Sequence, residues 1–180
     1  DGDIIEGDIK VGDFSLKGLD STDIIKRFGL TYVMEDRPVF WYLTIEENLA
    51  AAAYSRWNRT GKADMEKVFD YFPVLAKLRQ QKAGYTSGGE QQMLAFGMSL
   101  MTQPKILLFD EPSTNLDTQG KRSFREIIKK LKNSFYTIIL IEHDTDLFED
   151  LATCIYGMEK GELKKISGIE HVAHRGAMAY

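Results

Sequence analysis

Two acidic side chains stand directly after an apolar run in the second half of the sequence. The run Ile106 to Phe109 is followed at once by Asp110, Glu111 and Pro112. This pattern is typical of a buried strand that brings carboxylates to the edge of a sheet, where open α/β sheets bind their ligands. One of two adjacent carboxylates can hold hydrated Mg²⁺ while the other poises a water for attack. A strand that simply stops in a polar turn explains the same residues, so this motif alone does not decide.

A second group of candidate residues, Ser87, Gly88, Gly89 and Glu90, stands just before a predicted helix. Ser87 with Glu90 three residues later is a capping-box pattern, which is a purely structural interpretation. Two glycines are an unusual way to begin a helix, because each costs about 1 kcal/mol relative to Ala. Their lack of side chains lets a phosphate approach the backbone N–H groups at the positive helix end. The functional interpretation holds only in combination with the other motifs.

A histidine follows the next predicted strand along the chain. His143 stands between Glu142 and Asp144, just after the apolar run Thr137 to Ile141. At the same sheet edge as the acids, its imidazole could hydrogen-bond a terminal phosphate or an attacking water. A lone histidine is more often structural, so a functional role for this residue is supported only in combination with the other motifs. Asp117 is expected to cap the helix that follows it, whatever else its loop does.

In this order and spacing, four stretches of the chain resemble motifs of ABC ATPases. The signature motif, the Walker B strand, the D-loop and the switch histidine correspond to residues 87–92, 106–112, 113–117 and His143. Gly89 and Asp110 are 21 residues apart, and Glu111 and His143 are 32 apart. Each motif is modest on its own, whereas the four together are specific. The resemblance runs from about residue 6 to residue 161.

The resemblance implies a role for each candidate residue. Glu111 would be the general base that polarises the attacking water, and His143 would contact the γ-phosphate of ATP. Asp110 would hold Mg²⁺ through water, and Glu35, at the Q-loop position, would sit near the metal. Ser87, Gly88 and Gly89 would contact the nucleotide bound to the opposite subunit of a head-to-tail dimer, and Glu90 and Asp117 are also expected to bind nucleotide. The implied reaction is phosphoryl transfer, which depends mostly on positioning and on neutralising charge.

The first half of the chain resembles the ATPase subunits of branched-chain amino-acid importers. Residues 29–40, GLTYVMEDRPVF, and 43–49, LTIEENL, carry this likeness, with Glu35 where Gln is usual in other ABC ATPases. It implies an ATP-hydrolysing, Mg²⁺-dependent subunit that powers import of branched-chain amino acids or a similar small polar solute. The implied partners are a second ABC ATPase subunit and membrane permease subunits, on which residues 35–85 would dock. The implied location is cytoplasmic, peripheral on the inner face of the cell membrane.

The phosphate-binding loop of the family, G-x-x-x-x-G-K-[S/T], does not occur in the 180 residues. In the family it lies upstream of the stretch that matches residues 6–16, so we expect it before residue 1, in an N-terminally truncated domain. Because that loop supplies most of the phosphate grip, we expect this chain alone to bind ATP weakly or not at all and not to hydrolyse it. The loss of a central strand and helix should also expose apolar surface on the sheet.

Alternating apolar strands and amphipathic helices must position these motifs. We predict helices at about 21–28, 88–102, 118–132 and 145–151, and strands at 30–34, 106–109, 137–141, 153–158 and 162–166. A β segment is predicted at 4–16, and residues 46–82 are mostly helical, with Trp57, Phe69, Tyr71 and Phe72 as core anchors. The fold class is therefore α/β, a P-loop NTPase-like, mostly parallel sheet with helices on both faces and a helical insertion.

The whole chain is interpreted as one domain with four parts. These are a β segment with the Q-loop strand at 1–34, a helical subdomain at 35–86, the signature helix, Walker B and switch region at 87–168, and a tail at 169–180. The 180 residues suffice for one core, and the single cysteine, Cys154, fits a reducing compartment.

Composition argues against other classes of function. A formal net charge of -4 weighs against a nucleic-acid partner, and no apolar run approaches the roughly 20 residues of a membrane helix. An ABC ATPase of the chromosome type would carry a long coiled coil, and nothing here sustains three heptads. The remaining alternative is a non-catalytic binding module with the same fold. The presence of both Glu111 and His143 argues against it.

Overall fold

The computed structural model describes residues 7–168, apart from 35–37, 55–60, 115 and 135. The chain forms two compact units, Asp1–His143 and Asp144–Tyr180. Among the sequence predictions, Glu35, Trp57 and the tail at 169–180 lie outside the described residues. All the other candidate site residues belong to the first unit, which is described first.

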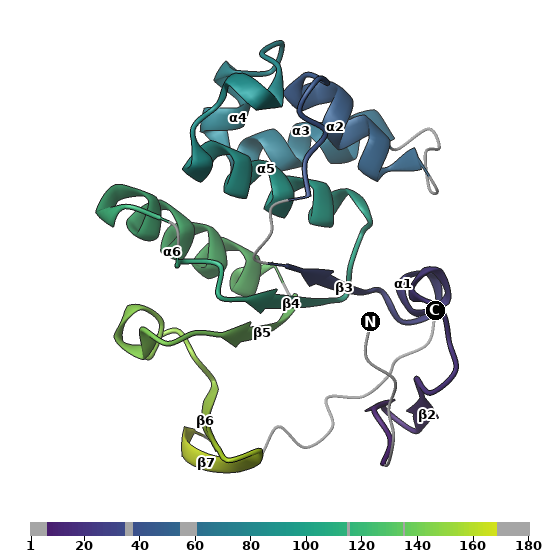
Figure 1. Ribbon diagram of the computed structural model, residues 1–180, viewed down its shortest axis with the longest axis vertical. Coiled ribbons are helices and arrows are strands. Elements are labelled where there is room, and N and C mark those ends of the chain that lie inside the picture. The colour runs from purple at the N-terminus through teal and green to yellow at the C-terminus, as the bar shows by residue number, and fades with distance from the viewer. Residues whose placement is uncertain (1–6, 35–37, 55–60, 115, 135, 169–180) are drawn as a thin grey trace. The chain divides into compact units, whose positions relative to one another are not determined.

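A three-stranded parallel sheet forms the centre of the first unit (Figure 1). Its strands, in spatial order, are β3 (Leu30–Val33), β4 (Ile106–Asp110) and β5 (Thr137–Ile141). In the register of the sheet, Val33 pairs with Phe109 and Asp110 pairs with Ile141. The three strands were predicted within one or two residues of their bounds. Because they are parallel, the residues that follow them gather at one edge.

Two long helices, α5 (Gly88–Met101) and α6 (Thr118–Asn133), pack on one face of this sheet. Each contributes an aromatic ring to a cluster with the central strand. Phe96 of α5, Phe109 of β4 and Phe124 of α6 are at most 1% exposed, with ring centroids 4.6 to 5.8 Å apart. Burying each ring stabilises the fold by about 1.5–3 kcal/mol. This cluster fixes the helices relative to β4 and so places the residues at the strand end.

The opposite face of the sheet is not covered to the same extent. Tyr32 alternates with buried residues of β3, and Ile139 and Ile141 alternate with half-buried residues of β5. The three side chains are 49%, 46% and 48% exposed. Sequence analysis predicted helices on both faces, but α5 and α6 lie on the same one. The apolar exposure predicted for this sheet is confirmed.

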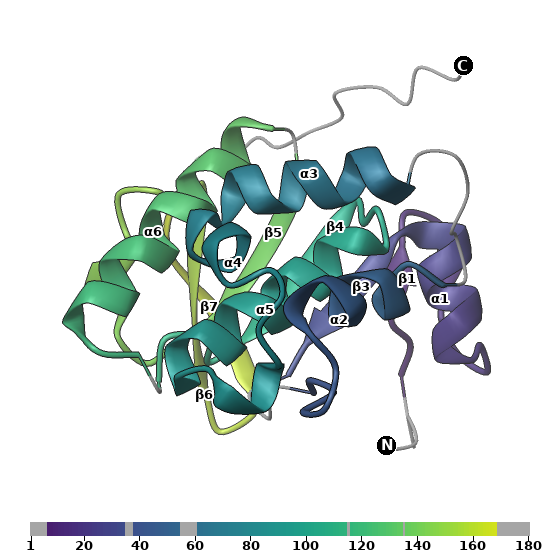
Figure 2. The ribbon, with the colours of Figure 1, turned by 90° about the horizontal axis from the view of Figure 1, so that it is seen from above.

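The helical segment predicted at 46–82 is present, and it packs on α5 (Figure 2). Its helices are α2 (Ile45–Ala52), α3 (Gly61–Tyr71) and α4 (Pro73–Lys77). Thr44 begins α2 with a capping box to Glu47, and the backbone of Gly97 in α5 approaches α2 and α3 closely. Phe69 and Phe72 are buried as predicted.

Tyr71 is not the core anchor that its aromatic ring suggested. It is half-buried, and its hydroxyl bonds the Ser134 hydroxyl at 2.9 Å. A phenol needs a hydrogen-bond partner when it is buried, so it favours the boundary between an apolar and a polar region. The aromatic type alone does not distinguish these two positions.

The N-terminal stretch forms a small hairpin followed by a helix. The elements are β1 (Lys10–Val11), β2 (Phe14–Ser15) and α1 (Ser21–Phe28). Gly29 ends α1 at φ +64°, where its N–H bonds the carbonyl of Ile25. A Cβ here would lie 3.0 Å from the backbone nitrogen of Lys105. Glycine therefore permits both the left-handed turn into β3 and the close approach of the chain that leads into β4.

The second unit consists of a short turn and a hairpin. The turn is the 3₁₀ helix η3 (Thr145–Leu147), and the antiparallel strands are β6 (Cys154–Glu159) and β7 (Glu162–Gly168). Both strands were predicted, whereas the α-helix expected at 145–151 is wrong. These residues form η3 and a turn after it instead. Within the described ranges, every helix is too short or too polar to span a bilayer.

Candidate functional site

Asp110 ends β4 and is held by a neighbour from β3. The hydroxyl of Tyr32 donates to Oδ2 of Asp110 at 2.6 Å. This hydrogen bond, followed by burial and by the charge of the carboxylate, raises the pKa of Tyr32 above its ordinary value of 10.0. Sequence analysis missed Tyr32. Its place one residue before the end of the neighbouring strand is the only signal that could have found it.

Glu111 takes a left-handed backbone conformation directly after the strand. Its φ is +44°, and its N–H donates to the carbonyl of Ile141 at 3.0 Å. Few non-glycine residues adopt this region, and those that do tend to cluster at functional sites. The turn re-aims the carboxylate, so that Oε1 lies 2.9 Å from Nε2 of His143 and Oε2 accepts from the hydroxyl of Thr114 at 3.1 Å.

The structure therefore brings Glu111 and His143 together, as their positions after β4 and β5 suggested. The imidazole is on the surface, with 88% of the His143 side chain exposed. Thr114 was not predicted as part of the site, although its spacing of three residues from Glu111 within a turn was a signal. A carboxylate with two polar partners and an exposed imidazole can hold a water molecule and share its proton.

Glu142 and Ser113 join the same two loops a second time. Ser113 is 1% exposed, and its N–H and hydroxyl donate to the two carboxylate oxygens of Glu142 at 3.0 and 2.9 Å. Sequence analysis assigned no role to either residue. An acidic residue beside His143 was visible, but nothing in the sequence tells which loop it contacts.

The start of α5 carries the capping box expected from Ser87 and Glu90. The Glu90 N–H donates to the Ser87 hydroxyl oxygen at 3.3 Å, and the Ser87 N–H donates to the Glu90 carboxylate at 2.7 Å. A Cβ on Gly89 would meet only Leu116, at an ordinary 3.7 Å. Packing within the described residues thus does not require glycine at this position. The missing side chain leaves the backbone N–H groups of the first turn open.

Asp117 performs the structural role predicted for it. It is the N-cap of α6, where its carboxylate accepts from the N–H of Gly120 at 2.7 Å. Leu116, beside it, packs against Gly89, so the loop after β4 meets the start of α5. Within the described part of the chain, no polar contact joins Ser87 or Glu90 to Asp110, Glu111 or His143.

Among the residues of this site, Asp110 provides one carboxylate that could bind a metal ion. Among the described residues there is no group of three or more His, Cys, Asp or Glu side chains arranged to hold a metal. Asp110 fits Mg²⁺, which usually keeps several waters and binds one or two carboxylates together with substrate phosphates. The second predicted metal ligand, Glu35, lies outside the described residues.

Comparison with known proteins identifies the family. The family model described as ABC transporter matches residues 3–114. The chain belongs to the ABC transporter family. The predicted family is confirmed, and so is the predicted likeness to branched-chain amino-acid importers. The relevant relative is the high-affinity branched-chain amino acid transport ATP-binding protein BraG of Pseudomonas aeruginosa, which is 39% identical over 157 residues.

Other relatives of this ABC transporter chain extend the picture. The probable branched-chain amino acid transport ATP-binding protein LivF of Archaeoglobus fulgidus is 32% identical over 76% of the chain. The molybdenum import ATP-binding protein ModC of Brucella melitensis is 32% identical over 87% of the chain. The chain spans 67% of BraG, 58% of LivF and 44% of ModC.

Solved structures with a similar fold are also ABC cassettes. A nucleotide-free ATP-binding cassette from an ABC transporter has a TM-score of 0.74 at 21% identity, covering 93% of this chain and 72% of its own. The ADP conformation of the cassette MJ1267 has a TM-score of 0.74 at 22% identity, covering 89% and 68%. At this identity the likeness shows the fold alone. The predicted α/β, P-loop NTPase-like fold is confirmed.

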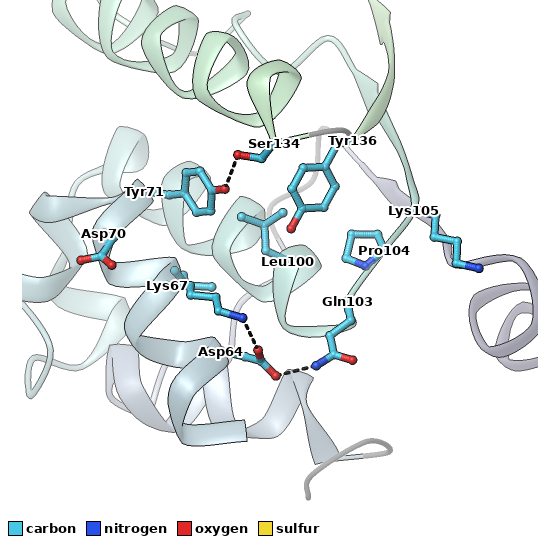
Figure 3. A pocket seen from close by; sticks show the side chains of 11 residues that line it. Asp64, Lys67, Asp70, Tyr71, Leu100, Gln103, Pro104, Lys105, Ser134 and Tyr136 are labelled. Carbon is cyan, nitrogen blue, oxygen red and sulfur yellow. Dashed lines mark hydrogen bonds and ion pairs between the residues drawn. The ribbon is translucent and has the colours of Figure 1, made fainter. Parts of the chain in front are cut away.

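A separate cleft of this ABC transporter chain lies away from the carboxylates (Figure 3). It has a volume of about 530 Å³ and is lined partly by residues just before β4 and β5, at the opposite sheet edge. Five residues of strand place that edge roughly 16 Å away. Asp64 pairs with Lys67 at 3.2 Å and with Gln103 at 2.5 Å, and Tyr71 bonds Ser134. None of the residues that line this cleft is a site residue predicted from the sequence, so the carboxylate edge is the better candidate site.

Proposed function

We propose that this chain is the main part of an ATP-hydrolysing subunit that powers an importer of branched-chain amino acids or a similar small polar solute. The observation that carries the proposal is the contact of Glu111 with His143, beside Asp110, at the carboxyl edge of the sheet. The 39% identity to BraG supports the class of solute. ATP and Mg²⁺ are the proposed cofactors.

Glu111 and His143 would carry the chemistry at the terminal phosphate. The Glu111 carboxylate would accept a hydrogen bond from the attacking water and take up its proton as the new bond to the γ-phosphorus forms, while the bond from that phosphorus to the bridging oxygen breaks and ADP leaves. The exposed His143 donates to the γ-phosphate and stabilises the charge that develops there. Asp110, with Glu35 outside the described residues, would hold Mg²⁺, which supplies charge neutralisation for the phosphates when it is bound.

The start of α5 would serve the nucleotide of a second subunit. A head-to-tail dimer would place Ser87, Gly88 and Gly89 against that nucleotide, with Glu90 and Asp117 at the border of the site. The open backbone N–H groups at the helix start, next to a glycine that packing does not require, support this assignment. Hydrolysis would then require two subunits, because in this arrangement each subunit completes the nucleotide site of the other.

A groove beside α2 is the proposed docking surface for the permease. It is lined by Val39, Phe40, Trp41, Tyr42, Leu43, Lys82, Gly84 and Tyr85, the last two from the 3₁₀ helix η2 (Ala83–Tyr85). Phe40, Trp41, Tyr42 and Tyr85 are all more than half exposed. The fully buried Asn48 fixes the groove wall through bonds to Phe40, Leu43 and Thr44. A preformed, exposed aromatic groove is typical of a protein interface.

This docking would set both the location and the division of labour. We propose a cytoplasmic subunit, peripheral on the inner face of the cell membrane, in which the helical subdomain at 35–86 contacts the permease. Residues 1–34 and 87–168 would form the nucleotide-binding part, and no role is assigned to 169–180. We further propose that the 180 residues alone bind ATP weakly and do not hydrolyse it, because they contain no G-x-x-x-x-G-K-[S/T] run.

The test is a single substitution in the full-length protein, assembled with its permease. Glu111→Gln should lower the rate of ATP hydrolysis by at least about 100-fold while nucleotide binding persists, because the general base is lost and its shape is kept. Glu126→Gln, on the exposed side of α6, is the matched control and should leave the rate unchanged. If the unaltered protein binds ATP but does not hydrolyse it, the chain is the non-catalytic binding module. Hydrolysis that survives Glu111→Gln would exclude this glutamate as the base.

A further inference from the structure

Two consecutive residues after β5 each reach across to the loop after β4. His143 contacts Glu111 through Nε2 and Oε1 at 2.9 Å. Glu142 accepts from the N–H of Ser113 at 3.0 Å and from its hydroxyl at 2.9 Å. With the bond from the Glu111 N–H to the Ile141 carbonyl, the two loops are joined at three successive positions.

The contact between Glu142 and Ser113 is the strongest of these cross-links in chemical terms. A single carboxylate receives two hydrogen bonds from one residue, and hydrogen bonds to a charged acceptor are about twice as strong as neutral ones. Ser113 is 1% exposed, so water does not compete for its N–H. It also lies beyond the end of β4, where the sheet offers its N–H no partner.

This cross-link lies next to a strained backbone position. Glu111 holds φ at +44°, a conformation that persists in a non-glycine residue only where its surroundings enforce it. Pro112 and Ser113 follow directly, and both are buried. By fixing Ser113, Glu142 holds the far side of the turn that aims the Glu111 carboxylate. The same Glu142 precedes His143, so it fixes both members of the proposed catalytic pair.

We propose that Glu142 is a positioning residue that sets the distance between Glu111 and His143 through its two hydrogen bonds from Ser113. The inference rests on the proposed function, in which Glu111 and His143 act at the terminal phosphate. Glu142 itself touches no reacting atom. Its loss would leave both partners present but allow the two loops to separate, and misplacement by about 1 Å can cost a factor of 10² in rate.

A double-mutant cycle in the full-length protein, assembled with its permease, tests this role. Glu142→Ala should lower kcat for ATP hydrolysis by about 10- to 100-fold with KM for ATP changed less than about twofold. Ser113→Ala, which keeps the N–H bond, should lower kcat about three- to tenfold. The double variant should be no slower than Glu142→Ala alone, because both changes break one connection. Glu142→Gln, which keeps one acceptor and the side-chain shape, should restore part of the lost rate.

Two results would overturn the proposal. One is a kcat for Glu142→Ala within twofold of the unaltered protein, and the other is a double variant whose loss is the product of the two single losses. If Glu142→Ala does not fold, Ser113→Ala and Glu142→Gln decide. Each should lower kcat while its melting temperature stays close to that of the unaltered protein, and an unchanged kcat in both would refute the role. Failure of the proposed function is distinguishable, because hydrolysis would then survive Glu111→Gln.

Discussion

The Ser87 hydroxyl group has two roles, one in capping helix α5 and one proposed in binding nucleotide. As the N-cap of α5 its oxygen accepts from the Glu90 N–H, and as a proposed nucleotide ligand its hydrogen donates to a phosphate of the opposite subunit. The two roles do not exclude each other, because a hydroxyl accepts and donates at once. The bond from Glu90 is 3.3 Å long, which is at the weak end for this interaction. A substitution that separates the two roles is therefore informative.

Alanine and glycine at position 87 separate capping from nucleotide contact. Ser87→Ala should lower the free energy of unfolding by about 1 kcal/mol, whereas Ser87→Gly should lower it by only a few tenths, because glycine is a tolerated N-cap. Both variants lose the hydroxyl, so both should slow ATP hydrolysis in the full-length protein to a similar extent. Urea denaturation and steady-state hydrolysis measure the two effects. A glycine variant with unaltered hydrolysis would mean that the hydroxyl does not contact nucleotide.

Sequence reasoning reached some site residues and missed others for a physical reason. Glu111 and His143 were predictable as neighbours because apolar runs fix where parallel strands end. Glu142 was not, because its contact depends on the left-handed turn at Glu111, which the residue type does not indicate, and the spacing of Thr114 from Glu111 was only a weak signal. Tyr32 was missed because a bond across a sheet depends on register, which the sequence leaves open.

Helix α5 contains a glycine whose purpose is packing. Gly97 lies in the middle of the helix, and a Cβ there would come within 2.9 Å of Val68 in α3 and 3.1 Å of Leu49 in α2. Both neighbours are at most 2% exposed and have little room to move. The missing side chain thus lets three helices meet at one point.

Gly97→Ala should therefore destabilise the protein, although alanine is the better helix former. Overpacking costs typically 1–3 kcal/mol, and the gain in helix propensity offsets at most about 1 kcal/mol of it. The expected net loss of unfolding free energy is about 1 kcal/mol, measured by urea denaturation. Gly97→Ala with Val68→Ala, which removes the methyl groups that clash, should not lose more than Val68→Ala alone. If Gly97→Ala alone increased the stability, the three helices would have to move apart enough to accommodate the added methyl group.

A second element-scale feature is the ion pair that ties α2 to the chain after α4. Arg79 donates to Glu46 at 2.6 Å and to Glu66 of α3 at 3.0 Å, and its guanidinium stacks over Phe69 at 4.8 Å from the ring centroid. The hydrogen bond from Arg79 is the main cause that lowers the pKa of Glu46 below its ordinary 4.5. A depressed pKa in the folded state means that the carboxylate stabilises the fold above about pH 4.5. That contribution is lost as the pH falls through the folded pKa.

Glu46→Gln should accordingly have an effect that depends on pH. At pH 7 the variant should lose roughly 1 kcal/mol or less of unfolding free energy, because the pair is partly exposed. As the pH falls below about 4.5 the difference from the unaltered protein should shrink, since Glu46 of the unaltered protein becomes protonated and then carries no charge, like the glutamine of the variant. Urea denaturation at pH 7 and pH 3.5 measures it, with Glu126→Gln as the control for any lost carboxylate. A difference that grows on acidification would contradict the assigned role.

Among the elements, the best predictions came where the local signals agree. Ser21–Phe28 carries an N-cap aspartate before it and Gly29 after it, and both ends of α1 were predicted correctly. The segment 145–151 has apolar residues at helical spacing but no glycine directly after it, and it forms only a 3₁₀ turn followed by irregular chain. Local pattern defines an element when its caps and length concur.

For the molecule as a whole, the uncovered sheet face is the feature that most affects behaviour in solution. Tyr32 on β3 and Ile139 and Ile141 on β5 present apolar side chains about half exposed on the two outer strands of the sheet, opposite the face that α5 and α6 cover. A contiguous apolar face of this kind favours association or contact with another protein segment. The 180 residues by themselves should therefore self-associate and bind an apolar dye.

Ile139→Lys should reduce that association, because a charge on this face opposes its burial. Gln119→Lys adds the same charge on an exposed part of α6 and serves as the matched control. Light scattering after size-exclusion chromatography, together with fluorescence of 8-anilinonaphthalene-1-sulfonate, measures both variants of the 180-residue chain. The expected result is a smaller assembly and weaker dye fluorescence for Ile139→Lys alone. Equal behaviour of the two variants would mean that other exposed apolar residues, such as Trp41 and Tyr42 in the docking groove, drive the association.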